Sequence, residues 1–350
     1  MELITYQETL AKDSLVYVDV RSPKEFAEST IPEAVNIPVF NNEERDEIGT
    51  TYVQESPMKA RMLGIDLLSP KLPRLVKEIK ALTDEYSYVV LFCARGGLRS
   101  ESIGVITELI GVKLYKLEGG YKSYRHFILD QLEDYELESD LLVIHGNTGV
   151  GKTELLYSLQ EKEVPIIDLE GLANHRGSAF GGIGLGKPTN QKHFDSLLWE
   201  RLEELNGAEL IAVEAESKRI GMSVLPEFFL QAMEEGIHIL IESTLEARVN
   251  RIYKEYAVSY EEDPDAFIDR WLESLTAIKK HIIKKAGKDE YKRLVKLSKA
   301  GELKKVIRTL LTEYYDPLYE YSQRQHDSFA LRTESDDIPE ITEEIIDFLG

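Results

Sequence analysis

A single cysteine among 350 residues stands in a setting that suits a nucleophile. Cys93 follows the apolar run 88–92 and precedes a helical stretch, so we expect its thiol in a loop at a helix N-terminus. Backbone N–H groups and the helix dipole favour an anion there and lower the pKa of a thiol. The loop also holds two cations and two glycines that let its amides converge: Arg95, Gly96, Gly97 and Arg99. This pattern predicts a thiolate that holds or attacks an anionic group. The alternative is a small buried residue at a strand end.

A second motif, GNTGVGKT at 146–153, fits the phosphate-binding loop (P-loop) pattern G-x-x-x-x-G-K-[ST] and lies between a predicted strand and a predicted helix. In such a loop the amides surround phosphate oxygens, the lysine adds charge and the hydroxyl binds a phosphate-linked Mg²⁺. The residues concerned are Gly146, Gly149, Gly151, Lys152 and Thr153. After the strand 210–213 the chain carries Glu214 and Glu216, where a hydrolase usually has an aspartate. We therefore expect diphosphate binding without rapid nucleotide hydrolysis.

The segment between the P-loop and these glutamates is rich in glycine and in cations. Residues 168–194 include six glycines together with the candidate site residues Asp168, His175, Arg176, Lys187, Lys192 and His193. Arg219, shortly after Glu216, is a further candidate. One interpretation is a flexible loop without a specific role. The other is a mobile lid that supplies cations to a polyanion.

These motifs require strands and helices to position them, and the chain provides two such frameworks. Residues 1–130 alternate helices with apolar strands, predicted at 14–20, 86–92 and 112–120. That alternation is typical of a mainly parallel sheet covered on both faces. The polar, acidic stretch 131–140 predicts a linker. A second α/β unit, resembling a P-loop NTPase, is predicted over 141–261, followed by a helical basic and aromatic extension over 262–350.

The net charge of −21 conceals a local reversal of sign. Residues 279–308 carry twelve Lys or Arg against three Asp or Glu, so the rest of the chain sums to −30. A basic stripe on an acidic body can bind nucleic-acid phosphates, since only the local field must attract them. The candidates for contacts with nucleic acid are Lys284, Lys285, Lys292 and Arg293. The alternative is a solvated amphipathic helix.

Two further features narrow the class of protein. The stretch EYYDPLYEYS at 313–322 places four tyrosines within ten residues, either as core residues or as a stacking platform for bases or an isoprenoid wall. The chain has no run of about 18 apolar residues, shows no secretory signal, and cannot form an internal disulfide with one cysteine. These features predict a cytoplasmic protein that does not enter a membrane.

The first unit resembles a rhodanese domain. The resemblance is carried by YVDVRSPKEFAESTIPEAVNIP at 17–38 and LEGGYKSYR at 117–125, and it places Cys93 at the catalytic position, which carries a persulfide in that family. ESTIPEA replaces the more usual Gly-His-Ile-Pro-Gly-Ala without affecting that assignment. Arg99 lies six residues after Cys93, whereas simple rhodaneses usually place the loop arginine five residues on. The longer spacing resembles the rhodanese-fold dual-specificity phosphatases and implies a wider cradle.

Nearly the whole chain resembles the tRNA 2-selenouridine synthase family, through segments that occur in order: DVRSPKEF, NNEERDEIGTTYVQ, CARGGLRS, GNTGVGKT, DLEGLANHRGSAFG, VEAESKRIG and YYDPLYEYS. The resemblance implies conversion of wobble 2-thiouridine in tRNA to 2-selenouridine through an S-geranyl-2-thiouridine intermediate. It implies geranyl diphosphate and selenophosphate as co-substrates, a selenophosphate-producing enzyme as a partner, no tightly bound cofactor, and Mg²⁺ at Thr153. Cys93 would carry selenium as a selenosulfide, stabilised by Arg95 and Arg99.

Two rival interpretations follow from the same residues. A rhodanese-type sulfurtransferase or phosphatase fused to an ATP-using kinase-like domain would keep Cys93 but require ATP turnover and no RNA. A non-catalytic scaffold would need degenerate sites, and it fits poorly because Cys93, Arg99, Lys152 and Thr153 are all present.

Overall fold

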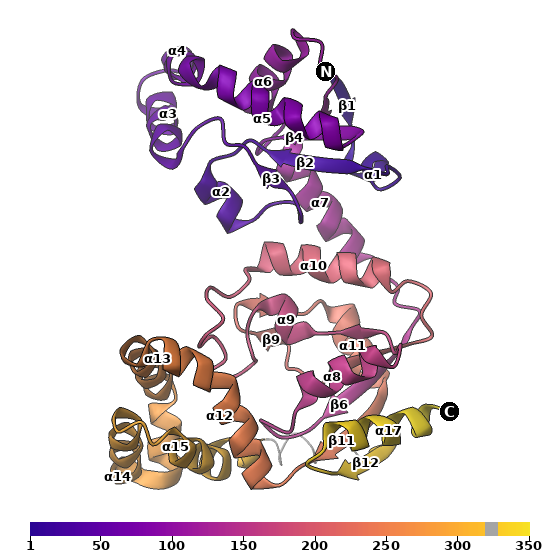
Figure 1. Ribbon diagram of the computed structural model, residues 1–350, viewed down its shortest axis with the longest axis vertical. Coiled ribbons are helices and arrows are strands. Elements are labelled where there is room, and N and C mark those ends of the chain that lie inside the picture. The colour runs from indigo at the N-terminus through magenta and orange to yellow at the C-terminus, as the bar shows by residue number, and fades with distance from the viewer. Residues whose placement is uncertain (319–327) are drawn as a thin grey trace. The chain divides into compact units, whose positions relative to one another are not determined.

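The computed structural model describes residues 1–318 and 328–350, which divide into two compact units (Figure 1). The first unit comprises Met1–Asp134 with Asp195–Trp199, and the second comprises Tyr135–Phe194 with Glu200–Gly350. The first boundary lies inside the predicted linker 131–140. Both units are built on parallel sheets with helices, which confirms the predicted fold class.

A five-stranded parallel sheet of order β1-β5-β4-β2-β3 forms the centre of the first unit. The longest pairing joins β2 and β4, whose β-branched and aromatic residues suit a buried strand. The predicted strands at 14–20, 86–92 and 112–120 are present as β2, β4 and β5, while β1 and β3 were not foreseen. The bounds are β1 (Glu2–Ile4), β2 (Leu15–Asp19), β3 (Val35–Asn36), β4 (Tyr88–Phe92) and β5 (Tyr115–Leu117).

Helices cover both faces of this sheet (Figure 1). On one face Leu75 of α5 and Ile103 of α6 pack in one buried cluster with Leu91 of β4. Phe92 points to the opposite face because side chains alternate along a strand, and there the Arg21 guanidinium lies over the Tyr121 ring of α7 at 4.2 Å. The bounds are α1 (Tyr6–Thr9), α2 (Pro23–Glu28), α3 (Asn42–Gln54), α4 (Pro57–Leu68), α5 (Leu72–Glu85), α6 (Leu98–Glu108) and α7 (Gly120–Glu133).

The second unit contains another five-stranded parallel sheet, of order β12-β11-β6-β8-β7. Its strands are β6 (Asp140–His145), β7 (Ile166–Ile167), β8 (Leu210–Glu214), β11 (Ile237–Glu242) and β12 (Leu331–Glu334). A short antiparallel hairpin is formed by β9 (Arg219–Ile220) and β10 (Ser223–Val224). The helices around the sheet are α8 (Lys152–Glu161), α9 (Leu169–Ala173), α10 (Gln191–Glu204) and α11 (Glu227–Glu235).

The prediction of a purely helical extension over 262–350 is wrong for its last part. β12 pairs in parallel with β11, from Ile239↔Leu331 to Glu242↔Glu334, and so adds an edge strand to the sheet. The helix α17 (Ile338–Leu349) then places Ile341 in the same buried cluster as Leu155 of α8. The C-terminal residues therefore complete the P-loop domain rather than extend from it.

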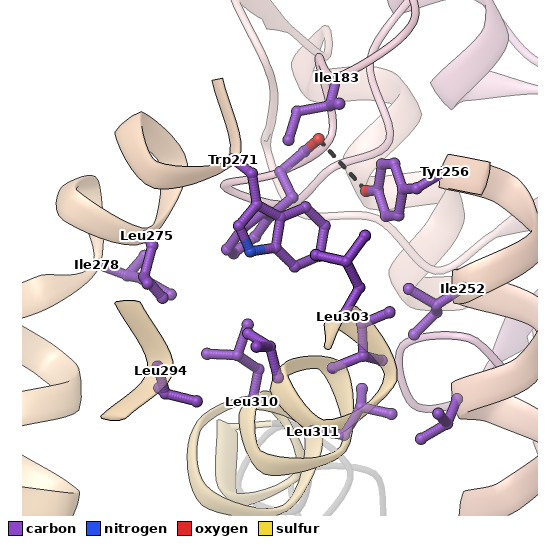
Figure 2. Packing of buried hydrophobic residues seen from close by; sticks show 14 of the residues in the cluster. Ile183, Ile252, Tyr256, Trp271, Leu275, Ile278, Leu294, Leu303, Leu310 and Leu311 are labelled. Carbon is purple, nitrogen blue, oxygen red and sulfur yellow. Dashed lines mark hydrogen bonds between the residues drawn. The ribbon is translucent and has the colours of Figure 1, made fainter. Parts of the chain in front are cut away.

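The remaining helices form a separate apolar cluster within the second unit. They are α12 (Leu245–Glu262), α13 (Pro264–Ala277), α14 (Lys279–Lys299), α15 (Leu303–Leu310) and a π-helical turn, η2 (Leu311–Tyr315). Figure 2 shows Trp271 within this cluster, with Tyr256 and Ile252 of α12 nearby and the leucines of α15 and η2 below it. Within residues 1–318 and 328–350, no helix combines the length and apolar character needed to cross a membrane.

Candidate functional sites

Cys93 lies where the sequence predicted it, in the loop between β4 and α6. The residue is buried, at 3% exposure, and two donors converge on its sulfur. The Gly97 N–H donates to Sγ at 3.2 Å, and the Ser100 hydroxyl donates to it at 3.3 Å. Ser100 was not among the predicted site residues. Two donors on one sulfur stabilise the thiolate over the thiol.

The pKa of the Cys93 thiol is lowered by this environment. Burial opposes ionisation, but hydrogen bonds from the Ser100 hydroxyl and from the backbone amides of Ser100 and Arg95 outweigh it, and the charge of Arg99 adds to them. A nucleophilic thiolate is therefore available closer to neutral pH than from an ordinary cysteine.

The Gly-Gly segment of the rhodanese resemblance packs directly against the cysteine loop. The backbone amides of Tyr121 and Lys122 donate to the carbonyls of Cys93 at 2.9 Å and Ala94 at 3.0 Å. A Cβ added at Gly120 would lie 2.2 Å from the Cys93 carbonyl oxygen, and the left-handed φ of +63° also favours glycine there. Only glycine therefore permits this approach, which fixes the shape of the loop.

The two loop arginines differ in their surroundings. Arg95 has an exposed side chain. Arg99 is half-buried and forms a bidentate ion pair with Glu25 of α2, at 2.5 and 3.1 Å. Burial opposes ionisation of Glu25, yet its hydrogen bonds and charge interaction with Arg99 lower its pKa to about 2. The positive charge of Arg99, which the sequence predicted for binding an anion in the cysteine loop, is therefore partly neutralised by Glu25.

The P-loop connects β6 to α8, with Gly149 and Gly151 in the left-handed region. Lys152 begins α8, and its Nζ lies 3.4 Å from the Gly146 carbonyl. Thr153 Oγ1 donates to Glu214 Oε1 at 2.6 Å. The predicted P-loop residues thus lie together at the end of β6, with Glu214 of β8 beside them.

Two arginines of α12 bond the backbone of the P-loop, and neither was predicted. Arg248 Nε donates to the Thr148 carbonyl at 3.0 Å, and an Arg251 nitrogen donates to the Val150 carbonyl at 3.1 Å. Arg248 also forms a bidentate ion pair with Asp316, which follows η2. Because the arginines bond the Thr148 and Val150 carbonyls, the amides of the loop remain available to bind an anion. Arg248 and Arg251 stand three residues apart on the helix that follows β11, and this spacing is the feature of the sequence that could have indicated a shared role.

An acidic cluster faces the P-loop. Glu170, Glu214 and Glu216 each offer an oxygen within 4.8 Å of the others. Glu214 is fully buried, and its Oε2 has no hydrogen-bond partner among the residues that the structure describes. Burial first, and the neighbouring carboxylates in addition, raise the pKa of both Glu214 and Glu170. Crowded carboxylates with an unpaired buried oxygen beside a threonine hydroxyl fit a hard divalent cation such as Mg²⁺.

Asp168, a further candidate from the sequence, lies at the start of α9. Its carboxylate caps α9 by accepting from the Gly171 amide at 2.7 Å, and it also accepts from the Tyr157 hydroxyl at 2.6 Å. Glu170, two residues on, takes the place in the acidic cluster instead.

The predicted lid lies over this cluster. Arg176 donates to the Ile183 carbonyl at 2.8 Å and is ion-paired with Glu255 of α12. Burial, with a contribution from the charge of Arg176, lowers the pKa of His175. Of the five predicted lid cations, Arg176 lines the phosphate cavity, whereas the other four do not: His175, Lys187, Lys192 and His193.

A cavity of about 890 Å³ lies between the P-loop, α12, the lid and the segment after β12. Its basic and hydroxyl-bearing lining includes Lys152, Thr153, Arg176, Ser178, Arg251 and Lys254. Its acidic lining comprises the cluster together with Glu154, Glu255, Asp336 and Asp337. The cavity suits a metal-bound polyphosphate, because cations and a metal-binding cluster meet there.

The basic stripe is interrupted. α14 bends at Gly287, whose φ is +89°, so the four predicted tRNA-binding residues fall on two helical halves. Lys292 pairs with Asp289 at 3.1 Å and Arg293 with Glu290 at 2.9 Å. Lys284 and Lys285 are exposed on the first half. Half of the predicted charge is thus compensated within its own helix.

The tyrosine-rich stretch is described only up to residue 318, and Tyr319 and Tyr321 lie outside the described residues. Tyr314 and Tyr315 are partly buried against the helical cluster, with their ring centroids 4.9 Å apart.

A thiolate loop in a parallel α/β unit, joined to a P-loop unit with a carboxylate cluster, defines a two-domain protein with rhodanese-like and P-loop parts. Residues 4–127 match the model of the rhodanese-like domain, and residues 139–346 match that of the tRNA 2-selenouridine synthase AAA domain. The tRNA 2-selenouridine synthase of Sulfurovum sp. (strain NBC37-1) is 34% identical over 90% of each chain. That of Hydrogenovibrio crunogenus is also 34% identical, over 91% of this chain and 92% of its own. The crystal structure of an N-terminal domain from Clostridium difficile 630 is 40% identical and covers 37% of this chain and 99% of that chain, with a TM-score of 0.36.

The chain therefore belongs to the tRNA 2-selenouridine synthase family, a family of tRNA-modifying enzymes.

Proposed function

We propose that this enzyme converts the wobble 2-thiouridine of tRNA to 2-selenouridine in two steps, with S-geranyl-2-thiouridine between them. Geranyl diphosphate supplies the prenyl group, and selenophosphate, provided by a selenophosphate-producing enzyme, supplies selenium. Family membership supports the overall conversion. The observation that carries the prenyl step is an apolar crevice that continues from the phosphate cavity.

Four residues line both spaces: Thr148, Ser178, Ile252 and Tyr256. Beyond them the crevice, of about 40 Å³, has walls of Phe180, Trp271, Ile307, Leu310, Leu311 and Tyr315, several of which appear in Figure 2. Geranyl diphosphate would place its charged diphosphate in the polar cavity and its hydrocarbon chain in the apolar crevice. A nucleotide would instead present a polar ribose and base to the apolar walls. The crevice is narrower than a ten-carbon chain, so its side chains would separate on binding.

The diphosphate head would be held by the P-loop amides and Lys152. Thr153 and the carboxylates of the acidic cluster would hold Mg²⁺, which stabilises the negative charge developing on the diphosphate as the prenyl carbon–oxygen bond breaks. Arg248 and Arg251 would keep the loop amides directed at the anion by bonding the Thr148 and Val150 carbonyls.

The oxidation level of selenium in selenophosphate limits the roles that Cys93 can have in the selenation step. Selenium in selenophosphate is already at the selenide level, so its transfer to Cys93 as a selenosulfide would need an oxidant. A balanced route has selenium attack C2 of S-geranyl-2-thiouridine while geranylthiolate leaves with the electron pair. The Cys93 thiolate then attacks phosphorus, and the selenium–phosphorus bond breaks with its electrons on selenium. Water finally displaces the cysteine sulfur and releases phosphate.

Two observations favour this phosphoryl-accepting role over the selenium carrier that the rhodanese resemblance implies. The Ser100 hydroxyl and the Gly97 amide stabilise the thiolate both as nucleophile and as leaving group. The six-residue spacing from Cys93 to Arg99 is also that of the phosphatase-like loop. A selenolate leaves readily, so this step needs no general acid.

Nucleoside mass spectrometry of the full-length protein tests the proposal. With 2-thiouridine tRNA and geranyl diphosphate alone, S-geranyl-2-thiouridine should accumulate, and added selenophosphate should convert it to 2-selenouridine. Lys152→Ala should abolish geranylation yet still convert supplied S-geranyl-2-thiouridine tRNA. Rapid tRNA-stimulated ATP hydrolysis without a geranylated product would instead favour the kinase-like alternative.

A further inference from the structure

A second depression adjoins the phosphate cavity on the far side of the lid. It measures about 460 Å³ and is lined by His175, Gly177, Ser178, Ala179, Pro188, Arg219, Gly221 and Met222. Gly177 and Ser178 line both spaces, so the two adjoin at this part of the lid. The depression lies wholly within the second unit.

Side chains that contact the backbone hold the segments around this depression in place. The His175 ring packs on the β9–β10 hairpin so closely that a Cβ at Gly221, whose φ is +57°, would lie 2.7 Å from its Cγ. Gln191 bonds both the amide and the carbonyl of Val224, at 2.7 and 3.0 Å. Asn174 donates to the Lys187 carbonyl at 2.8 Å. The depression is therefore a built feature rather than a loose gap between loops.

The depression differs from the phosphate cavity in the charge of its lining. The other side of that cavity carries Glu154, Glu255, Asp336 and Asp337, which repel a phosphodiester backbone. Among the residues that the structure describes, the lining of the depression includes no acidic side chain, and the lining residue Arg219 has an exposed side chain. Met222, 59% exposed, gives it an apolar surface beside that cation. An exposed apolar side chain next to an arginine suits an unstacked base and its phosphate.

We propose that the depression receives the wobble nucleotide of the tRNA, with the base turned out against Met222 and the His175 ring and a flanking phosphate at Arg219. This inference rests on the proposed function, which requires the 2-sulfur to approach the prenyl carbon at the phosphate cavity. Because Gly177 and Ser178 line both spaces, a base in the depression lies next to the diphosphate that the P-loop would hold, and its 2-sulfur would approach the prenyl carbon past these two residues.

Neighbouring residues of the hairpin supply a matched pair of variants. Arg219 lines the depression, whereas the adjacent Lys218 is ion-paired with Glu227 at 2.9 Å and does not line it. With an anticodon stem-loop RNA carrying 2-thiouridine at the wobble position, Arg219→Ala should raise the KM for RNA about tenfold, as expected for loss of one charge-assisted contact. Met222→Ala should act in the same direction. The KM for geranyl diphosphate should not change, and Lys218→Ala should leave both constants within about twofold of the wild type.

Photocrosslinking gives a second readout that does not depend on turnover. The same RNA with 4-thiouridine at the wobble position should crosslink to peptides containing 175–179 or 219–222. An unchanged KM for RNA in Arg219→Ala, or crosslinks confined to other segments, would overturn the inference while geranylation by the wild type upheld the proposed function. Crosslinks to these peptides without any geranylation would support the nucleotide site and count against the proposed chemistry.

Discussion

Thr153 and Glu214 are joined by a 2.6 Å hydrogen bond between the P-loop hydroxyl and a fully buried carboxylate. The Thr153 hydroxyl donates to Oε1 of Glu214, whereas Oε2 has no hydrogen-bond partner among the described residues. A buried carboxylate oxygen left in this way is costly unless a proton or a cation occupies it. In our proposal, binding of Mg²⁺ with diphosphate removes that cost.

We predict that Glu214→Gln uncouples the diphosphate from the metal. Wild-type protein with Mg²⁺ and inorganic diphosphate at 100 times Kd should gain about 2.7 kcal/mol of unfolding free energy. The glutamine variant should lose most of this gain, measured as a thermal shift. Glu227→Gln, a change in an exposed surface ion pair, should retain it. An equal Mg²⁺-dependent shift in wild type and Glu214→Gln would exclude Glu214 as a ligand.

The lone cysteine makes the thiol site directly measurable, because alkylation reports on Cys93 alone. Ser100→Ala removes a hydroxyl that donates to Sγ, so the pKa of the Cys93 thiol should rise. The pH profile of iodoacetamide labelling should shift to higher pH, and the rate at pH 7 should fall. Phosphate release from selenophosphate in the presence of S-geranyl-2-thiouridine tRNA should fall with it. A shifted labelling profile with undiminished phosphate release would exclude the thiolate from that step.

Short-range patterns revealed most of the fold and much of the two sites. The P-loop and the cysteine loop are contiguous motifs, and their flanking strands are apolar runs, so the sequence locates them without tertiary information. β12 was missed because it is a short edge strand, LRTE, with mixed polarity, and its partner β11 lies some 90 residues earlier. Nothing local marks such a strand.

Some contacts of the candidate site residues could not be read from the sequence for the same kind of reason. Asp168 and Glu170 are equally acidic in the sequence, and only the start of α9 decides which of them caps the helix and which enters the cavity. The ion pair between Arg99 and Glu25 joins residues 74 positions apart, so the loop sequence could not show that this charge is compensated.

That ion pair predicts a specific loss of stability in acid. The pKa of Glu25 in the folded protein is about 2, below the ordinary value of 4.5, so the contribution of the ionised carboxylate to stability is complete above about pH 4.5 and is lost as pH falls toward 2. Urea unfolding at pH 7 should show Glu25→Gln less stable than the wild type, and the difference should narrow at pH 3. Asp66→Asn, a change at an exposed carboxyl of α4, should not show this narrowing. A difference that stays constant with pH would argue against an ionised Glu25.

The bend at Gly287 refines the prediction for tRNA binding. Among the described residues of α14, no acid is ion-paired with Lys284 or Lys285, and Lys285 Nζ lies 3.5 Å from the Tyr314 carbonyl. Lys292 and Arg293 are each paired with an acid three residues earlier. Lys284→Glu with Lys285→Glu should therefore weaken tRNA binding more than the corresponding change at Lys292 and Arg293. If both lysines contact phosphates, the slope of log K against log salt should decrease in magnitude by about 2, at roughly 0.9 per neutralised phosphate. Unchanged affinity and slope in both double variants would make the stripe a solvated surface.

The apolar crevice predicts which prenyl chain the enzyme accepts. Leu311 is buried and lines the crevice, so Leu311→Ala should lengthen the space for the hydrocarbon tail. The ratio of kcat/KM for farnesyl diphosphate to that for geranyl diphosphate should rise about tenfold, as expected for burying about two further methylene groups at roughly 0.8 kcal/mol each. Leu294, equally buried in the same cluster, does not line the crevice and provides the matched control. Both alanine variants should lose about 2–5 kcal/mol of stability, so a rise in the ratio for Leu311→Ala alone cannot come from destabilisation. An equal change in both variants, or none in either, would place the prenyl chain elsewhere.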